Sequence, residues 1–168
     1  LRQFNTVFDD MTVNNHLVWD PASKAAALFD TGTDASKAIA TAVDLGLELG
    51  QLFLTHTHLD HIIDRAAVEA HNEDLRTYVN ALEPAERATR FQPGDCFTVG
   101  ALKISTRLTK GHSPGGITYV IEGLERPVAI AGDALFAQSM GGGMISYQDA
   151  LATNRSELFT LANHTVIC

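Results

Sequence analysis

Short apolar stretches, most of them alternating with polar residues, follow one another along the chain and predict many short strands. In the first half we expect strands at residues 2–8, 11–19, 25–29, 51–54 and 78–79. In the second half we expect strands at residues 96–99, 102–108, 117–121, 128–131 and 165–168. The turns Asp20-Pro21-Ala22-Ser23 and Pro93-Gly94-Asp95 separate consecutive strands, because proline and glycine favour turn conformations.

Three segments have the apolar spacing of helices instead. Asp34 precedes a run with apolar positions at Ile39, Val43, Leu45 and Leu47, and we expect it to cap a helix there. A second helix is expected over residues 62–71. A third begins at Ser146-Tyr147-Gln148-Asp149, which resembles a capping box, and extends to about Leu161. Strands followed by a helix therefore occur twice, which predicts one domain, residues 1–168, of two sheets packed face to face with helices outside.

Composition is typical of a soluble globular protein. The chain has 168 residues, of which 45% are hydrophobic and 19% charged, so it can bury one sizeable core. No apolar run approaches the length of about 18 residues that suggests a membrane span. No basic segment followed by an apolar one marks a signal peptide, and we expect a cytoplasmic protein.

Charge and cysteine content narrow the choice of partners. The net charge is −8, without a cluster of lysine and arginine, which argues against nucleic acid or an anionic membrane as the main partner. A small-molecule substrate is therefore expected, and the oligomeric state stays open. Two cysteines do not form a disulfide framework, and Cys96 is expected to be a small core residue within its strand.

The segment His56-Thr57-His58-Leu59-Asp60-His61 carries most of the functional information. It places three imidazoles and a carboxylate within six positions, directly after the apolar run 52–54. Such groups need hydrogen-bonding partners when buried, and a divalent cation provides one by accepting neutral imidazole and carboxylate as ligands. On an extended segment His56 and His58 point to the same side, and Asp60 and His61 can turn toward a second ion. The alternative is a polar turn in which Asp60 caps the next helix.

Two more side chains are candidate ligands. His112 lies in Gly111-His112-Ser113-Pro114-Gly115, a tight loop between two strands, and Asp133 follows Gly132 at the end of the strand 128–131. Taken alone, His112 is typical of a turn histidine and Asp133 of a helix cap. Beside the first motif we predict that both bind metal, because a carboxylate can bridge two cations through its two oxygens.

These motifs resemble the metallo-β-lactamase-fold metallohydrolase superfamily, in particular its glyoxalase-II-like branch. The matching pieces are Asp30-Thr31-Gly32, the His56–His61 segment, the loop 111–115 and Gly132-Asp133, in the order of the family. The resemblance implies an α+β fold, an αββα sandwich of two mixed sheets flanked by helices. It also implies two divalent metals, with zinc expected and iron or manganese as alternatives. His56, His58 and His112 would hold one metal, Asp60 and His61 the other, and Asp133 would bridge them.

The sequence departs from the family pattern at several positions. The family usually has a further histidine just after its last core strand, whereas this sequence ends at Cys168, and a truncated C-terminal end is therefore expected. Ser139-Met140-Gly141-Gly142-Gly143 replaces the Gly-Arg element of the glyoxalase-II-like branch, so the chain is not a close match to glyoxalase II itself. The glycine run is interpreted as a flexible connector or as backbone against which a substrate lies. His16, His71 and His164 are expected to be structural.

The leading hypothesis from the resemblance is a dinuclear metal hydrolase. A metal-bound hydroxide would attack the carbonyl of a thioester, ester or lactone, and Asp60 would be the catalytic residue that orients it and carries its proton. Thr55, Thr57 and Asp30 are expected to orient the imidazoles.

Other activities remain open on the same fold. A mononuclear iron dioxygenase of the persulfide dioxygenase type would use His56, His112 and Asp133 as two histidines and one carboxylate. A catalytically inactive metal-binding domain is a third possibility. A nuclease is disfavoured by the acidic composition.

Overall fold

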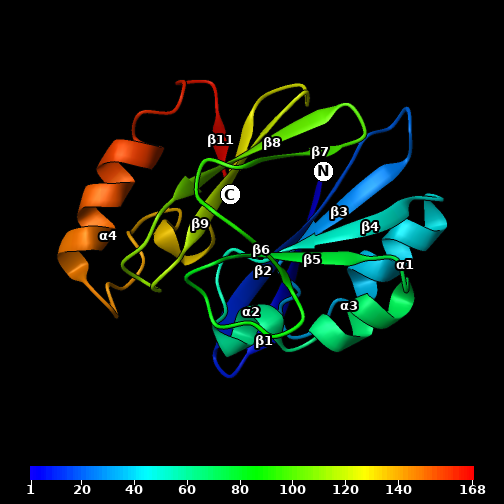
Figure 1. The fold of residues 1–168 in the computed structure, drawn as a ribbon, viewed down its shortest axis with the longest axis horizontal. Helices are drawn as coiled ribbons and strands as arrows, with labels where there is room; N and C mark the ends of the chain where they lie inside the picture. Colours follow the sequence, from blue (N-terminus) through cyan, green and yellow to red (C-terminus); the bar gives the residue numbers. More distant parts are fainter.

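Eleven strands form two sheets that pack against each other in the computed structural model, which describes all residues 1–168 (Figure 1). The first sheet is mixed and has the order β1-β2-β3-β4-β5-β6. Its strands are β1 (Arg2–Phe8), β2 (Met11–Trp19), β3 (Ala25–Phe29), β4 (Glu48–Phe53), β5 (Arg76–Asn80) and β6 (Thr89–Phe91). The pairs β1–β2 and β2–β3 are antiparallel, whereas β3, β4, β5 and β6 run parallel to one another.

The second sheet is also mixed and has the order β11-β10-β9-β8-β7. Its strands are β7 (Cys96–Val99), β8 (Leu102–Leu108), β9 (Ile117–Glu122), β10 (Val128–Ile130) and β11 (Val166–Ile167). Only β10 and β11 are parallel, and the other neighbours are antiparallel. Each of the ten expected strand segments overlaps an observed strand, and β6 is the one strand that was not expected.

Helices cover the outer side of this pair of sheets. They are α1 (Ser36–Asp44), α2 (Leu59–Ile62), α3 (Arg65–His71) and α4 (Tyr147–Thr153), which continues as a π-helical turn, η2 (Asn154–Leu158). Figure 1 shows α1 and α3 along the first sheet and α4, in orange, at the opposite side of the molecule. This arrangement confirms the predicted αββα sandwich, and none of the helices combines the length and apolar character that a membrane crossing requires.

Two hydrophobic clusters hold the layers together. The larger lies between the sheets and is centred on aromatic rings: Phe29 stacks on Phe53 with ring centroids 5.1 Å apart, and Tyr119 contacts both. The other packs the first sheet against α1 and α3, with Leu28, Ala38 and Val68 among its fully buried members. The strand β3 thus buries both faces, which explains its continuous apolar run.

Several local expectations differ from the structure. The expected helix over residues 62–71 is two helices, because the chain turns at Ile63 and Asp64 between α2 and α3. The helix α1 ends at Asp44, so Leu45 and Leu47 lie beyond it, and its cap position is Ala35 rather than Asp34. Asp34 still accepts the backbone N–H of Ser36 at 2.9 Å, and the carboxylate of Asp64 accepts that of Ala35 at 2.7 Å.

The prediction of a buried Cys96 is wrong. Cys96 is exposed at the start of β7, a strand at the edge of the second sheet. Because side chains alternate along a strand and Val99 is buried, Cys96 faces solvent.

Candidate metal centre

The His56–His61 segment leaves the first sheet at the carboxyl end of β4. Two hydrogen bonds from β9 of the second sheet fix its start: the hydroxyl of Tyr119 donates to the carbonyl oxygen of Leu54 at 2.7 Å, and the N–H of Ile117 donates to that of Thr55 at 2.9 Å. The short helix α2 then begins at Leu59 and brings Asp60 and His61 back toward the sheets. The segment therefore lies where the two sheets meet.

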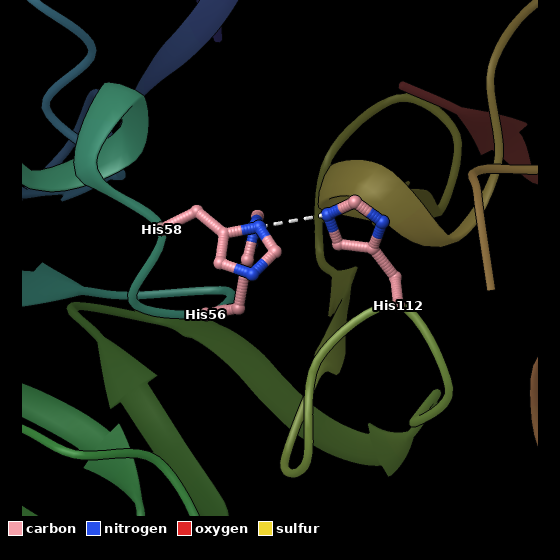
Figure 2. Close-up of side chains that lie close together, drawn as sticks. All are labelled: His56, His58 and His112. Carbon is pink, nitrogen blue, oxygen red and sulfur yellow. Dashed lines mark hydrogen bonds between the residues drawn. The ribbon is translucent and has the colours of Figure 1, made fainter. Parts of the chain in front are cut away.

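His56, His58 and His112 point toward one another across this junction (Figure 2). His112 comes from the loop between β8 and β9, as its Gly/Pro-rich sequence predicts, and its Nε2 atom lies 2.9 Å from Nδ1 of His58. One potential ligand atom from each ring lies within 4.8 Å of the others. A second group with the same spacing consists of His56, His61 and Asp133.

Asp133 belongs to the second group and also approaches His112 of the first. It belongs to a 3-10 turn, η1 (Gly132–Ala134), directly after β10. Its Oδ1 atom is 3.1 Å from Nε2 of His61, and its Oδ2 atom is 3.3 Å from Nε2 of His112. Asp60 lies at the edge of the cluster, with Oδ2 3.7 Å from Nε2 of His61. The structure thus brings all six predicted side chains to one place, with Asp60 in neither group of three.

Protein acceptors hold the outer nitrogen of three of the imidazoles. Nδ1 of His61 donates to the carboxylate of Asp30 at 2.8 Å, and Nδ1 of His112 lies 2.8 Å from the carbonyl oxygen of Gly142. Nδ1 of His56 lies 3.1 Å from the hydroxyl oxygen of Thr55. These contacts leave Nε2 of each ring directed at the cluster, which is the arrangement that a metal ligand requires.

Asp30 holds Thr55 and His61 in place through hydrogen bonds to both of its carboxylate oxygens. Its Oδ1 accepts the backbone N–H of Thr55, and its Oδ2 accepts the Thr55 hydroxyl as well as His61, with all three distances at 2.7–2.8 Å. Asp30 has a positive φ of 54°, a conformation that aspartate and asparagine adopt more readily than most residues. Contacts of Asp30 and Thr55 with the imidazoles agree with the predicted orienting roles, whereas Thr57 contacts Glu83 instead.

The buried nitrogens at the centre fit a bound cation. Nε2 of His56 is buried without a hydrogen-bond partner, and Nε2 of His61 is buried with only the carboxylates of Asp133 and Asp60 near it. An unpaired buried polar atom is costly, and a divalent cation with imidazole and carboxylate ligands removes that cost. Imidazole and carboxylate are ligands that zinc, iron and manganese accept, so the four histidines and two aspartates present fit such an ion.

Charges within the site shift the ionisation of its histidines in opposite directions. Burial, together with the charge of His61, lowers the pKa of His56 well below its ordinary value. Burial also acts to lower the pKa of His61, but Asp30 and Asp133 outweigh it and raise that pKa to about 10. For Asp133, burial acts to raise the pKa, but His61, His56 and His112 together lower it below its ordinary value. The site therefore favours a neutral imidazole at His56 and a protonated imidazole, paired with carboxylates, at His61.

Two of the three positions in the glycine run 141–143 lie close to other backbone, a feature that neither sequence interpretation included. A Cβ atom at Gly141 would collide with the carbonyl oxygen of Asp133, and one at Gly143 would collide with the backbone of Tyr147. The carbonyl oxygen of Gly142 meanwhile contacts His112. Glycine at positions 141 and 143 thus lets the backbone pass close to Asp133 and Tyr147.

Glu83 and Asn80 were missed by the sequence reasoning. Glu83 is buried and hydrogen bonds to Thr57 and Gly115, and Asn80 donates to the carbonyl oxygen of Gly115 at 2.7 Å. Asn80 ends β5 and Glu83 follows it, and because β5 is parallel to β4, both reach the same sheet edge as the His56–His61 segment. Their position at the carboxyl end of a strand next to β4 is the feature that could have identified them from the sequence.

The other histidines lie outside the cluster. His71 and His164 are exposed, and His16 is buried on β2 with its Nε2 atom unpaired. His16 borders a cavity of about 620 Å³ that also reaches Asp60, His61 and Asp133. The cavity gives a small molecule access to one side of the cluster.

Residues 9–158 match the family model described as the metallo-beta-lactamase superfamily. The chain is 28% identical over 158 residues to the mitochondrial persulfide dioxygenase ETHE1 of Bos taurus, an alignment covering 90% of this chain and 61% of that protein. It is also 28% identical to the hydroxyacylglutathione hydrolase GloC of Haemophilus influenzae, covering 92% of this chain and 82% of that protein. The chain thus spans about three fifths of the length of the persulfide dioxygenases that it matches.

Solved structures show the same fold. A B3 metallo-beta-lactamase, BLEG-1, superposes with a TM-score of 0.84 at 24% identity, covering 99% of this chain and 90% of that one. ETHE1 from Myxococcus xanthus superposes with a TM-score of 0.85 at 22% identity, covering 99% of this chain and 74% of that one. Both likenesses concern the arrangement of the strands and helices.

Proposed function

Because the chain belongs to the metallo-beta-lactamase superfamily, we propose that it is a metal-dependent hydrolase of activated carbonyl compounds. The proposed substrates are small-molecule thioesters, esters and lactones. The hydroxyacylglutathione hydrolases among its relatives support this choice, since the name of those proteins describes a thioester as their substrate.

The position of Asp133 is the observation that carries the proposal. One carboxylate directs its two oxygens at two different imidazoles, those of His61 and His112, which belong to different groups of candidate ligands that share His56. A carboxylate with this position could bridge two metal ions through its two oxygens. We therefore assign His56, His58 and His112 to one divalent ion, Asp60 and His61 to the other, and Asp133 to both.

The bound ions, for which zinc is proposed, would polarise the substrate carbonyl and lower the pKa of an attacking water. Residues of the chain itself orient the proposed metal ligands. Asp30, Thr55 and the carbonyl of Gly142 hold the imidazoles so that Nε2 faces the centre. Asp60 reaches the cluster from its partly exposed side, where its carboxylate is placed to accept a proton from the water and return it to the leaving group.

A second candidate is a mononuclear iron dioxygenase. The relatives named persulfide dioxygenase favour it, and His56, His112 and Asp133 supply two histidines and one carboxylate, a set that suits non-haem iron.

Metal analysis combined with two assays separates these candidates. We expect about two zinc ions per chain and hydrolysis of thioesters or lactones that a chelator abolishes. A single iron ion per chain with oxygen uptake on glutathione persulfide would replace the hydrolase by the dioxygenase. Bound metal without either activity would leave a metal-binding domain that is not an enzyme.

A further inference from the structure

Glu83 is a buried carboxylate with no role in the proposed chemistry. It lies in the connection between β5 and β6, and its residue is only 2% exposed. Burying a carboxylate is costly unless it is hydrogen bonded. The contacts that Glu83 makes therefore indicate why the chain keeps it there.

Its two oxygens reach two different loops. Oε2 accepts the hydroxyl of Thr57 at 2.7 Å and the backbone N–H of Thr57 at 3.1 Å. Oε1 accepts the backbone N–H of Gly115 at 2.7 Å. Thr57 lies between His56 and His58, and Gly115 ends the loop that carries His112. One side chain thus joins the first-sheet histidines to the second-sheet histidine.

Neighbouring residues make this link rigid. The guanidinium of Arg90 donates to the carbonyl oxygens of Ala81, Glu83 and Ala85, at 3.1, 2.7 and 2.8 Å. Asn80 donates to the carbonyl oxygen of Gly115. A Cβ atom at Gly115 would lie 2.8 Å from Cβ of Leu82, so the two loops approach closely only because residue 115 is glycine.

From these contacts we infer that Glu83 is a positioning residue that sets the distance between the His56–His58 pair and His112, and thereby the affinity of the metal site these three imidazoles form. The inference rests on the proposed function, because it requires that these histidines bind a metal. Ligand atoms must lie within about 0.2 Å of their ideal distance from the ion, so a loop displacement of a few tenths of an ångström weakens binding.

The substitution Glu83→Gln tests this inference. The amide keeps the size of the side chain, but its nitrogen donates, so at least one of the three donors at Thr57 and Gly115 loses its acceptor. Removing a group that orients metal ligands typically weakens metal binding about 10-fold to 100-fold, and we expect a loss of that size for Zn²⁺. Competition with a chromophoric chelator measures the affinity.

Two variants serve as controls. Glu86→Gln removes an exposed carboxylate from the same connection and should leave the Zn²⁺ affinity unchanged. Ile121→Val lowers stability in the core between the sheets, away from the ligands, and shows how much of any loss comes from stability alone. The absorption spectrum of bound Co²⁺ adds a readout of ligand geometry, which should change for Glu83→Gln and for neither control.

The outcomes are distinguishable. If the unmodified protein fails to bind Zn²⁺ or Co²⁺, the proposed function itself fails. If it binds them and Glu83→Gln matches it in affinity and Co²⁺ spectrum, the inference about Glu83 is overturned. If Glu83→Gln does not fold, the variant Thr57→Val replaces it, because it removes only the hydroxyl that donates to Glu83. Weaker Zn²⁺ binding by Thr57→Val would support the positioning role of Glu83, and unchanged binding would contradict it.

Discussion

The ring of His61 donates its Nδ1–H to the carboxylate of Asp30 at 2.8 Å, and both side chains are buried. The contact joins the end of β3 to the helix α2 and fixes which ring nitrogen faces the cluster of candidate ligands. Asp30 also holds Thr55, whose hydroxyl contacts His56. One carboxylate thus orients two imidazoles of the proposed metal centre.

We expect Asp30→Asn to weaken metal binding at His61. Asparagine tolerates the positive φ of this position, and its oxygen can still accept the N–H of Thr55. Its amide nitrogen, however, cannot accept the N–H of His61. The affinity for the metal ion proposed to bind His61 should fall about 10-fold to 100-fold. The metal content after dialysis should therefore drop from two ions per chain toward one. The exposed Asp34→Asn is the control, and two tightly held ions in Asp30→Asn would contradict the role.

We expect Asp60→Ala to abolish turnover while the protein stays folded. Asp60 is partly exposed and lies outside both groups of three ligands, so its loss should affect proton transfer more than folding. A positioned acid or base contributes about 100-fold to 10,000-fold, which is the expected fall in kcat on the best thioester. Glu73→Ala, at an exposed position, should retain activity, whereas activity retained in Asp60→Ala would exclude its catalytic role.

Gly141→Ala should disturb the metal site more than Gly142→Ala does. The new methyl group at residue 141 would collide with the backbone of Asp133, whereas at residue 142 it would meet only Met144, at 3.9 Å. Overpacking of this kind costs about 1–3 kcal/mol, and here it displaces the proposed bridging ligand. Metal content and thermal unfolding of the two variants, measured side by side, test this order; equal effects would show that the glycine run is flexible.

His16 should make the metal-free protein less stable in acid. Burial lowers the pKa of His16 to about 4, although the charge of Asp30 acts in the opposite direction. Between the unfolded value near pH 6.5 and about pH 4, the unfolded chain binds a proton that the folded chain does not, so stability falls as the pH falls. The loss of folding stability due to His16 reaches about 3 kcal/mol at the acid end of this pH window.

Urea unfolding of chelated protein at several pH values measures this effect. The variant His16→Gln should show a shallower loss of stability between about pH 6.5 and pH 4 than the unmodified protein. His71→Gln, at an exposed position, controls for the removal of an imidazole. Parallel pH profiles for His16→Gln and the unmodified protein would mean that His16 does not resist protonation.

The sequence predicted the parts of this molecule whose pattern is local. Alternation along β2 and β8 and the apolar run of β3 located those strands, because each buries a defined face. The candidate ligands were recognisable because imidazoles and carboxylates gathered at strand ends have few other uses. The spacing of His56, His58 and His61 within one loop is also a local property.

What the sequence did not predict depends on distant contacts. Glu83 is recognisable only through Thr57 and Gly115, which lie 26 and 32 positions away. The strand β6 has three residues, too few for a periodic pattern, and exists because it pairs with β5. Cys96 was assigned to the core by its residue type, whereas the burial of Val99 on the same strand decides its direction.

The candidate ligands come from both sheets, since the histidines at positions 56, 58 and 61 follow β4 whereas His112 and Asp133 follow β8 and β10. Contacts between such distant parts of a chain form late in folding, because closing the intervening loop is entropically costly. During synthesis, the His56–His61 segment emerges well before Asp133 exists. An ion that reaches the nascent chain therefore meets an incomplete chelate, and full coordination becomes possible only once the second half has been made and has docked on the first.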